Sequence, residues 1–123
     1  MAPRRGERRL ESCIFCKIAR RELPSTILYE NEYVMAFEDI SKMAPTHVLI
    51  IPKKHLQSVL ELDPTDGNLL SALQEAVIAV AKKTGVYETG FRVITNVLEE
   101  AGQTVFHLHY HILGGRKLEV SLG

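Results

Sequence analysis

Polar and apolar residues alternate without a break over residues 107–113, which read His-Leu-His-Tyr-His-Ile-Leu. A period of two is typical of a β-strand, because successive side chains point to opposite faces of a sheet. The pattern therefore predicts a strand with three imidazoles on one face, about 7 Å apart at ~3.3 Å per residue. The opposite face of this strand is apolar and suits a packed core. The histidine row consists of His107, His109 and His111, and the apolar row of Leu108, Tyr110 and Ile112.

Four other segments are predicted to be strands. Residues 26–29 and 33–37 are β-prone and are separated by a short polar turn, so we expect them to form a hairpin. Residues 46–51 are a nearly continuous apolar run that Pro52 ends, and residues 91–95 form a further strand.

Two helices are predicted, one short and one long. The short helix covers residues 14–23 and ends before Pro24. The long helix begins with Asp63 as its cap and Pro64 in the first helical position, and it ends at Gly85. The apolar positions that recur at helical spacing within it are Leu69, Leu70, Leu73, Ala76, Val77 and Val80.

The order of these elements is a short helix, three strands, a long helix and two strands. This order is typical of an α+β fold in which the long helix covers one face of a five-stranded antiparallel sheet. The other face of the sheet would then be open to carry the histidines.

The composition describes an ordinary globular chain. With 123 residues, 46% hydrophobic and 24% charged, it suits one domain, which we place at residues 13–123. Residues 1–12 contain four arginines and are expected to be a basic, disordered tail without a secretory signal, since no apolar segment follows them.

The charge balance and the cysteines narrow the partners and the setting. The 15 basic and 15 acidic residues cancel, so no electrostatic argument favours nucleic acid or a membrane as a partner. No apolar run approaches the ~20 residues of a membrane span. The only cysteines, Cys13 and Cys16, are too close together to staple a fold. We expect a reducing, cytoplasmic setting, in which a Cys-x-x-Cys pair binds a metal, is redox-active or does neither.

The histidine-rich run is part of a longer motif. Residues 102–113, Gly-Gln-Thr-Val-Phe-His-Leu-His-Tyr-His-Ile-Leu, resemble the histidine triad (HIT) family, whose hallmark is His-x-His-x-His followed by two apolar residues. Further segments in matching order resemble the Hint branch of that family, and the resemblance covers about residues 13–116. These segments are 13–18, 36–40, 44–47, 51–55 and 111–116.

The resemblance implies a HIT-like fold and a homodimeric hydrolase. Such enzymes cleave the P–N bond of purine nucleoside 5′-phosphoramidates, which are conjugates of AMP or GMP with an amine, or aminoacyl-adenylate-like conjugates. The middle histidine, here His109, is the nucleophile and becomes nucleotidylated, and a neutral imidazole with a pKa of ~6.5 suits that role. His107 lies beside it, and His111 would hold a phosphate oxygen or the leaving group. His47 resembles the family's fourth histidine and would assist proton transfer to the amine; the alternative is a hydrogen-bonded histidine at a strand end.

The resemblance also implies a nucleotide site. Asp39 would accept both ribose hydroxyls, although such a carboxylate can also simply cap a loop. Asn96 would lie near the bridging atom of the substrate. A phosphate would be held by Gly102, Gln103 and Thr104, which could otherwise form a plain hairpin turn. The base would lie in an apolar slot, unless these residues are ordinary core; they are Ile14, Phe15, Ile18, Phe37, Ile40 and Leu49.

In zinc-bearing relatives the metal ligands match four residues of this chain. They are Cys13, Cys16, His55 and His107, a set suited to a tetrahedral structural zinc site. The alternative is a pair of thiols without metal. The hydrolytic chemistry itself needs no cofactor.

The chain departs from the family pattern in a few places. Leu98 stands where a glycine is usual, and leucine resists a positive φ, so this loop is expected to run differently. Thr104 replaces the usual serine, and the C-terminus lacks the Trp-Pro-Pro ending of well-studied relatives, which leaves the preferred amine open.

Three other functions stay open from the sequence. One is a zinc hydrolase in which all three triad histidines bind one metal, although three ligands in line along a strand converge poorly. The second is a nucleotide-binding regulatory module with little catalysis. The third, redox chemistry at the cysteine pair, is weak because the pair does not follow a strand in a βαβ unit.

Overall fold

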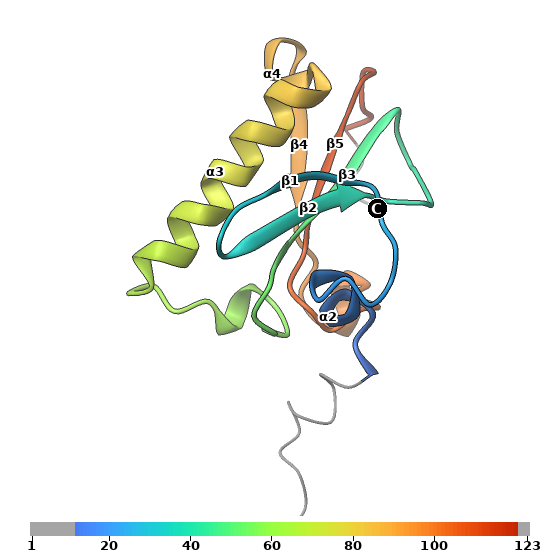
Figure 1. Ribbon diagram of the computed structural model, residues 1–123. Coiled ribbons are helices and arrows are strands. Elements are labelled where there is room, and N and C mark those ends of the chain that lie inside the picture. Colours follow the sequence, from blue (N-terminus) through green and yellow to red (C-terminus); the bar gives the residue numbers. More distant parts are fainter. Residues whose placement is uncertain (1–11, 121–123) are drawn as a thin grey trace, which may run out of the picture.

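The computed structural model describes residues 12–120, which form an antiparallel sheet with one long helix on one face (Figure 1). The strands are β1 (Ile27–Glu30), β2 (Val34–Glu38), β3 (Thr46–Pro52), β4 (Phe91–Ile94) and β5 (Tyr110–Gly114). They are arranged in the order β1-β2-β3-β5-β4. The predicted α+β class and five-stranded antiparallel sheet are confirmed. The tail predicted at residues 1–12 lies outside the described residues, apart from Ser12.

The helices are α2 (Ile14–Ala19), α3 (Gly67–Thr84) and α4 (Val86–Thr89), with single 3₁₀ turns at η1 (Val59–Glu61) and η2 (Glu99–Ala101). The short helix ends at Ala19, four residues earlier than predicted, and α4 was not predicted. No helix within residues 12–120 has the length and apolar character needed to cross a membrane.

The predicted start of the long helix was wrong. The cap of α3 is Asp66, whose side chain accepts the Leu69 N–H at 3.1 Å. Asp63 instead accepts the backbone N–H and the hydroxyl of Thr65, at 2.8 and 2.7 Å, and so holds a turn before the helix. The predicted end is right, because Gly85 adopts the positive φ of +85° that favours glycine after a helix.

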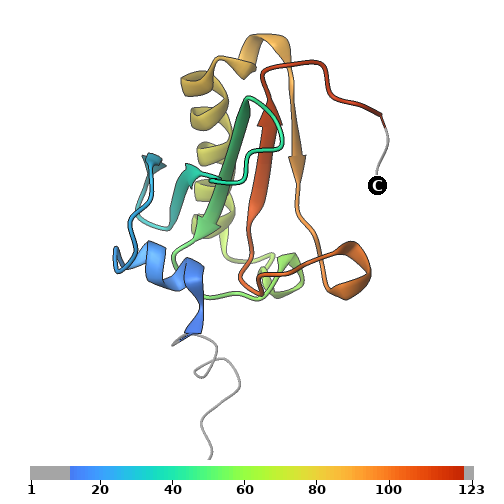
Figure 2. The same ribbon diagram turned by 90° about the vertical axis from the view of Figure 1, so that its right-hand side faces the viewer.

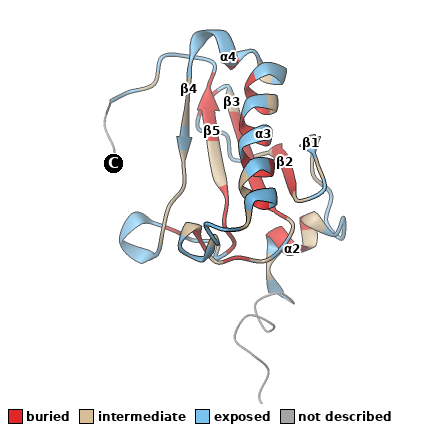
Figure 3. Ribbon diagram, turned by 90° about the vertical axis from the view of Figure 1, so that its left-hand side faces the viewer, coloured by how far each residue is buried: buried red, intermediate tan, exposed pale blue. Residues whose placement is uncertain are grey.

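The sheet separates two apolar clusters (Figure 3). On one face, α3 packs against β1, β2 and β3, and its buried stripe joins Val48, Leu108 and Ile112. On the other face, α2 contributes Phe15 and Ile18 to a smaller cluster. Strand side chains therefore alternate between the α3 face and the α2 face, and the histidines lie on the α2 face.

The histidine segment is a strand only in its second half. β5 begins at Tyr110, so the predicted strand over residues 107–109 was wrong. The backbone there bonds to loops and side chains: Leu108 N–H donates to the Leu56 carbonyl at 2.6 Å, and the Thr95 hydroxyl donates to the His109 carbonyl at 2.9 Å. The alternation of faces is nonetheless kept, because Leu108 lies in the α3 core.

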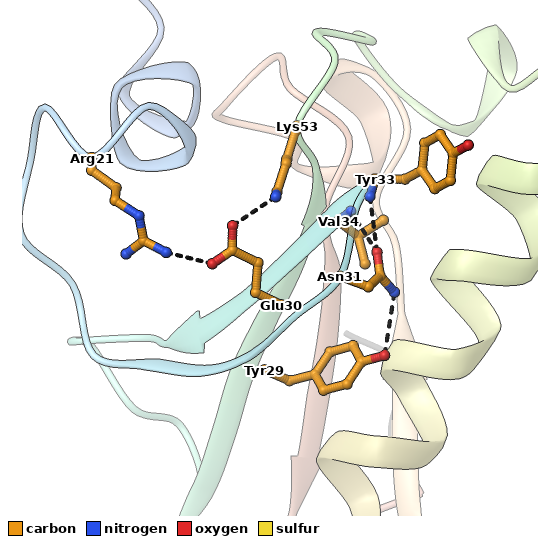
Figure 4. A network of polar contacts seen from close by, with 7 residues as sticks. All are labelled: Arg21, Tyr29, Glu30, Asn31, Tyr33, Val34 and Lys53. Carbon is orange, nitrogen blue, oxygen red and sulfur yellow. Dashed lines mark hydrogen bonds and ion pairs between the residues drawn. The ribbon is translucent and has the colours of Figure 1, made fainter.

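Polar contacts fix the C-terminal end of β1 (Figure 4). The Asn31 side chain accepts the N–H groups of Tyr33 and Val34, at 3.0 and 2.9 Å, which closes the predicted hairpin turn. Glu30 forms ion pairs with Arg21, which follows α2, and with Lys53, which follows β3, the latter at 2.6 Å. This triad ties the end of α2 to the sheet.

Candidate active site

A cleft of about 970 Å³ opens on the α2 face of the sheet. Figure 2 shows the sheet with α3 behind it and α2 at its lower end. Ten of the predicted site residues line this cleft: Ile14, Phe15, Ile18, Phe37, Asp39, Ile40, Leu49, Thr104, His109 and His111. Ile14 and Ile40 are 48% and 100% exposed, so the cleft presents apolar side chains to solvent. An apolar cleft with a few polar groups is typical of a small-molecule site.

His109 is held in one tautomer. Its Nδ1 lies 2.7 Å from the His107 carbonyl oxygen, which can only accept, so Nδ1 carries the proton. In the neutral ring the lone pair is then on Nε2. The ring of Phe15 packs edge-on against it, with centroids 5.1 Å apart. The side chain is buried yet lines the cleft, and Nε2 is the ring nitrogen that is not bonded to the His107 carbonyl.

His111 is oriented by a chain of hydrogen bonds. The Met43 N–H donates to His47 Nδ1 at 3.1 Å, so the proton of neutral His47 is on Nε2. That Nε2 lies 2.9 Å from His111 Nδ1 and 3.3 Å from Asp39 Oδ2. His111 Nδ1 therefore accepts, and its own proton is on Nε2. His111 is thus a donor and His109 an acceptor, with ring centroids 5.0 Å apart.

Burial keeps these imidazoles neutral. Burial, together with neighbouring His109 and His47 and against Asp39, lowers the pKa of His111 to about 4. Burial also lowers the pKa of His47, again against Asp39. At neutral pH both rings therefore keep the single-proton states that their hydrogen bonds select.

A second cluster lies behind His109. The ligand atoms of Cys13, Cys16, His55 and His107 all lie within 4.8 Å of one another. His107 Nδ1 is 3.3 Å from Cys13 Sγ and 3.5 Å from Cys16 Sγ, and His55 Nδ1 is 3.2 Å from Cys16 Sγ. Ligands of tetrahedral zinc are separated by roughly 3.6 Å for a nitrogen and a sulfur. His107 donates Nε2–H to the Pro52 carbonyl at 2.8 Å, which leaves Nδ1 unprotonated toward the thiols. The donor set therefore fits a zinc ion.

The three triad histidines do not converge on one point. Among residues 12–120, His107 belongs to the cysteine cluster, whereas His111 groups with Asp39 and His47. His109 belongs to neither group. In the second group the Met43 N–H places a proton on His47 Nε2, the atom that a metal would need. The geometry therefore disfavours a three-histidine zinc hydrolase.

Besides the metal ligands Cys13, Cys16 and His55, five predicted site residues do not line the cleft. His47 and His107 lie behind His111 and His109, as described. Asn96 is half-buried and Gly102 exposed, on the loop between β4 and β5. Gln103 is buried, and its amide is directed at backbone groups instead of the cleft.

Part of the cleft wall was not predicted from the sequence. The segment from Leu23 to Thr26 lines it, together with Ser41, Lys42 and Val105. Pro24 marked this segment only as the end of a helix. Its approach to the cleft depends on how the chain returns from α2 to β1, and no periodicity signals that path.

Known proteins resemble this chain closely. Residues 20–118 match the HIT domain. Over 108 residues the chain is 43% identical to the purine nucleoside phosphoramidase of Escherichia coli (strain K12), an alignment that covers 88% of this chain and 91% of that protein. A HIT family hydrolase from Clostridium thermocellum superposes with a TM-score of 0.86 at 52% identity, covering 91% of this chain and 97% of that one. One from Legionella pneumophila gives 0.85 at 41% identity, with 90% and 99% covered.

Proposed function

The chain belongs to the HIT domain family, and we propose that it hydrolyses the P–N bond of purine nucleoside 5′-phosphoramidates through a nucleotidylated histidine. A relative at 43% identity is named purine nucleoside phosphoramidase, and similar solved structures are described as HIT family hydrolases. These names support hydrolysis as the reaction class. The substrate would be AMP or GMP joined through phosphorus to an amine.

The observation that carries the proposal is the tautomer of His109. The His107 carbonyl holds the proton on Nδ1, so the Nε2 lone pair is available at the cleft. The donor at His111 Nε2 lies beside it and suits a phosphate oxygen or the leaving nitrogen. One acceptor for phosphorus and one donor next to it are the groups that a displacement at phosphorus requires.

In the first step, Nε2 of His109 bonds to phosphorus as the bond from phosphorus to the amine breaks. The amine leaves with the electron pair of that bond and takes a proton from His111. The His47–His111 pair then regains a proton from water. In the second step, water attacks phosphorus and releases the nucleotide from His109, and the proton of that water passes to solvent. The nucleotidylated histidine divides one difficult displacement into two easier ones.

The rest of the cleft would hold the nucleoside. The apolar slot between α2 and the sheet, with Phe15 and Ile40 on its walls, suits a purine ring. One Asp39 oxygen accepts the Ser41 N–H at 2.8 Å and the other faces His47, so the carboxylate is fixed where a ribose would lie. Thr104 supplies a hydroxyl for a phosphate oxygen, with Asn96 and Gly102 nearby in the chain.

The test is hydrolysis of adenosine 5′-phosphoramidate by the wild-type protein and by His109→Ala, with zinc content measured on both. We expect turnover to fall by at least ~10³-fold in the variant while zinc is retained. Loss of zinc together with turnover would instead favour a metal-activated water. Tight AMP binding without turnover by the wild type would favour a regulatory nucleotide-binding module.

We also propose that Cys13, Cys16, His55 and His107 hold a structural zinc ion. The support is the fit of the four ligand atoms to tetrahedral separations. Bound zinc would supply no step of the reaction; it would fix α2 and His107 to the segment after β3. Replacement of both cysteines by serine should abolish zinc in elemental analysis, whereas zinc content should be unchanged in Ser58→Ala, a buried polar residue outside the cluster.

Finally, we propose a homodimer that uses α3 and the sheet edge at β4. Among the described residues β4 pairs only with β5, so its other edge is available to a second copy. Val93 on β4 and Ile78 on α3 are 46% and 40% exposed, and α3 packs mainly over β1 to β3. In sedimentation analysis Val93→Glu should give monomers, while Leu60→Glu, at an exposed apolar position elsewhere, should leave a dimer. A monomeric wild type would contradict this part of the proposal.

A further inference from the structure

Gln103 is the polar residue of the predicted phosphate loop that does not face the cleft. It is 6% exposed, and its side chain makes three hydrogen bonds to backbone groups. Its Oε1 accepts the Leu98 N–H at 2.7 Å, and its Nε2 donates to the carbonyls of Gln57 and Val105, at 2.6 and 3.1 Å. A primary amide has two N–H groups, and both are used here. None is left for a phosphate oxygen.

The first partner of this amide is a strained residue. Leu98 has φ +64° and ψ −174°, a region that is essentially restricted to glycine. A leucine in this region persists only when its surroundings hold it there. Here Gln103 holds both ends of the residue, because its side chain accepts the Leu98 N–H and its own N–H donates to the Leu98 carbonyl at 3.1 Å.

The second partner connects the loop to the nucleophile segment. Gln57 follows Leu56, whose carbonyl accepts the Leu108 N–H at 2.6 Å, directly before His109. The amide of Gln103 therefore ties the turn at Leu98 to the same backbone segment that supports the nucleophile. Thr104, the next residue, lines the cleft.

We propose that Gln103 is a positioning residue of the hydrolase and not a phosphate ligand. Its amide holds Leu98 in the positive-φ conformation, and the turn so fixed places Thr104 beside the phosphate. The inference rests on the proposed function of the cleft. It also accounts for the leucine at this position of the loop, since the amide supplies the restraint that a glycine would not need.

The experiment is a double-mutant cycle on hydrolysis of adenosine 5′-phosphoramidate. The loss of kcat/KM caused by Gln103→Met is measured in the wild type and in Leu98→Gly, at a temperature at which circular dichroism shows every variant folded. A misplaced loop costs up to ~100-fold in rate. If the amide restrains Leu98, the loss in the Leu98→Gly background should be at least ~5-fold smaller, because the strain is gone.

Ala101→Gly is the matched control. It adds a glycine to the same turn without relieving Leu98, so we expect no recovery. Should Gln103→Met not fold, Gln103→Leu serves in its place, since it likewise lacks the oxygen that accepts the Leu98 N–H. Equal losses in both backgrounds would show that Gln103 does not act through Leu98, which would overturn the inference while leaving the proposed function intact. Absence of turnover by the wild type would overturn the proposed function and the inference with it.

Discussion

Substitutions of Leu98 test whether this residue is strained. A glycine variant is usually less stable than an alanine variant, but we expect the reverse order of stability here. A non-glycine residue in its conformation, φ +64° and ψ −174°, costs about 1–3 kcal/mol. Leu98→Ala keeps a Cβ and with it this strain, whereas Leu98→Gly removes both. Glycine loses more freedom on folding than alanine, by about 0.4–1 kcal/mol. Both variants lose the same half-buried leucine side chain, which is 49% exposed. Leu98→Gly should therefore be more stable than Leu98→Ala by about 0.5–2 kcal/mol.

The assay is urea unfolding of the two variants, with thermal unfolding as a second readout. A difference of 1 kcal/mol corresponds to roughly 3–5 °C in Tm for a chain of this size. Ala101→Gly, in the neighbouring 3₁₀ turn, is the control and should show the ordinary loss of about 0.5–1 kcal/mol. If Leu98→Gly proves less stable than Leu98→Ala, Leu98 is not strained. The amide of Gln103 would then have no strained conformation to hold in place.

Three further predictions concern pH, an ion-pair network and a tight turn. Because burial lowers the pKa of His111 from 6.5 to about 4, the unfolded chain binds more protons between these values and wild-type stability falls as the pH falls. The free energy of unfolding of the wild type, measured with urea, should therefore fall relative to that of His111→Gln by up to about 1.4 kcal/mol per pH unit between pH 6.5 and 4. A difference between the two proteins that does not change with pH would contradict this. Glu30→Gln breaks two ion pairs, one of them to Arg21, and should cost about 1 kcal/mol at low salt and less in 1 M NaCl. Gly115→Ala should cost about 1–3 kcal/mol in thermal unfolding, because φ is +89° and the new Cβ would lie 2.9 Å from Pro45 Cβ, and an unchanged Tm would refute the close approach.

The periodicity of apolar residues predicted the sheet and the long helix, because the burial of one face imposes that periodicity on the sequence. The apolar positions of α3 recur over 18 residues, and a stripe of that length must be buried against another element, which here is the sheet. The alternation over residues 107–112 was equally reliable for the two faces, since the α3 core takes Leu108 and Ile112 and the α2 face takes the histidines. Both predictions concern which side of the chain is buried.

Hydrogen bonds that run to distant loops could not be predicted in this way. Side chains can alternate between two faces without the backbone pairing to another strand. Residues 107–109 do so, because their backbone bonds to Leu56 and Thr95 instead of a neighbouring strand. The start of α3 was predicted wrongly for a related reason. Asp63 and Asp66 can both cap, and only the folded chain shows which of them meets an N–H of the helix.

The candidate site was predicted better for side chains than for what orients them. Residue types and the family resemblance indicated ten residues that line one cleft. They assigned Gln103 to the substrate because an amide is a donor, but its partners are carbonyls from elsewhere in the chain. A donor's target is a matter of geometry, and the sequence contains only the donor.

The three histidines show how one residue type can be prepared for three different roles. Period-two spacing places all three rings on the α2 face, and the backbone then decides which nitrogen of each ring carries the proton. His107 gives its Nε2–H to Pro52 and turns Nδ1 to the thiols, whereas His109 gives its Nδ1–H to the His107 carbonyl and turns Nε2 to the cleft. His111 accepts at Nδ1 from His47 and presents Nε2–H. The proposed metal ligand, nucleophile and donor therefore differ in their hydrogen bonds. His107 takes part in two of these proposed roles, because its imidazole faces the two cysteines while its carbonyl sets the tautomer of His109.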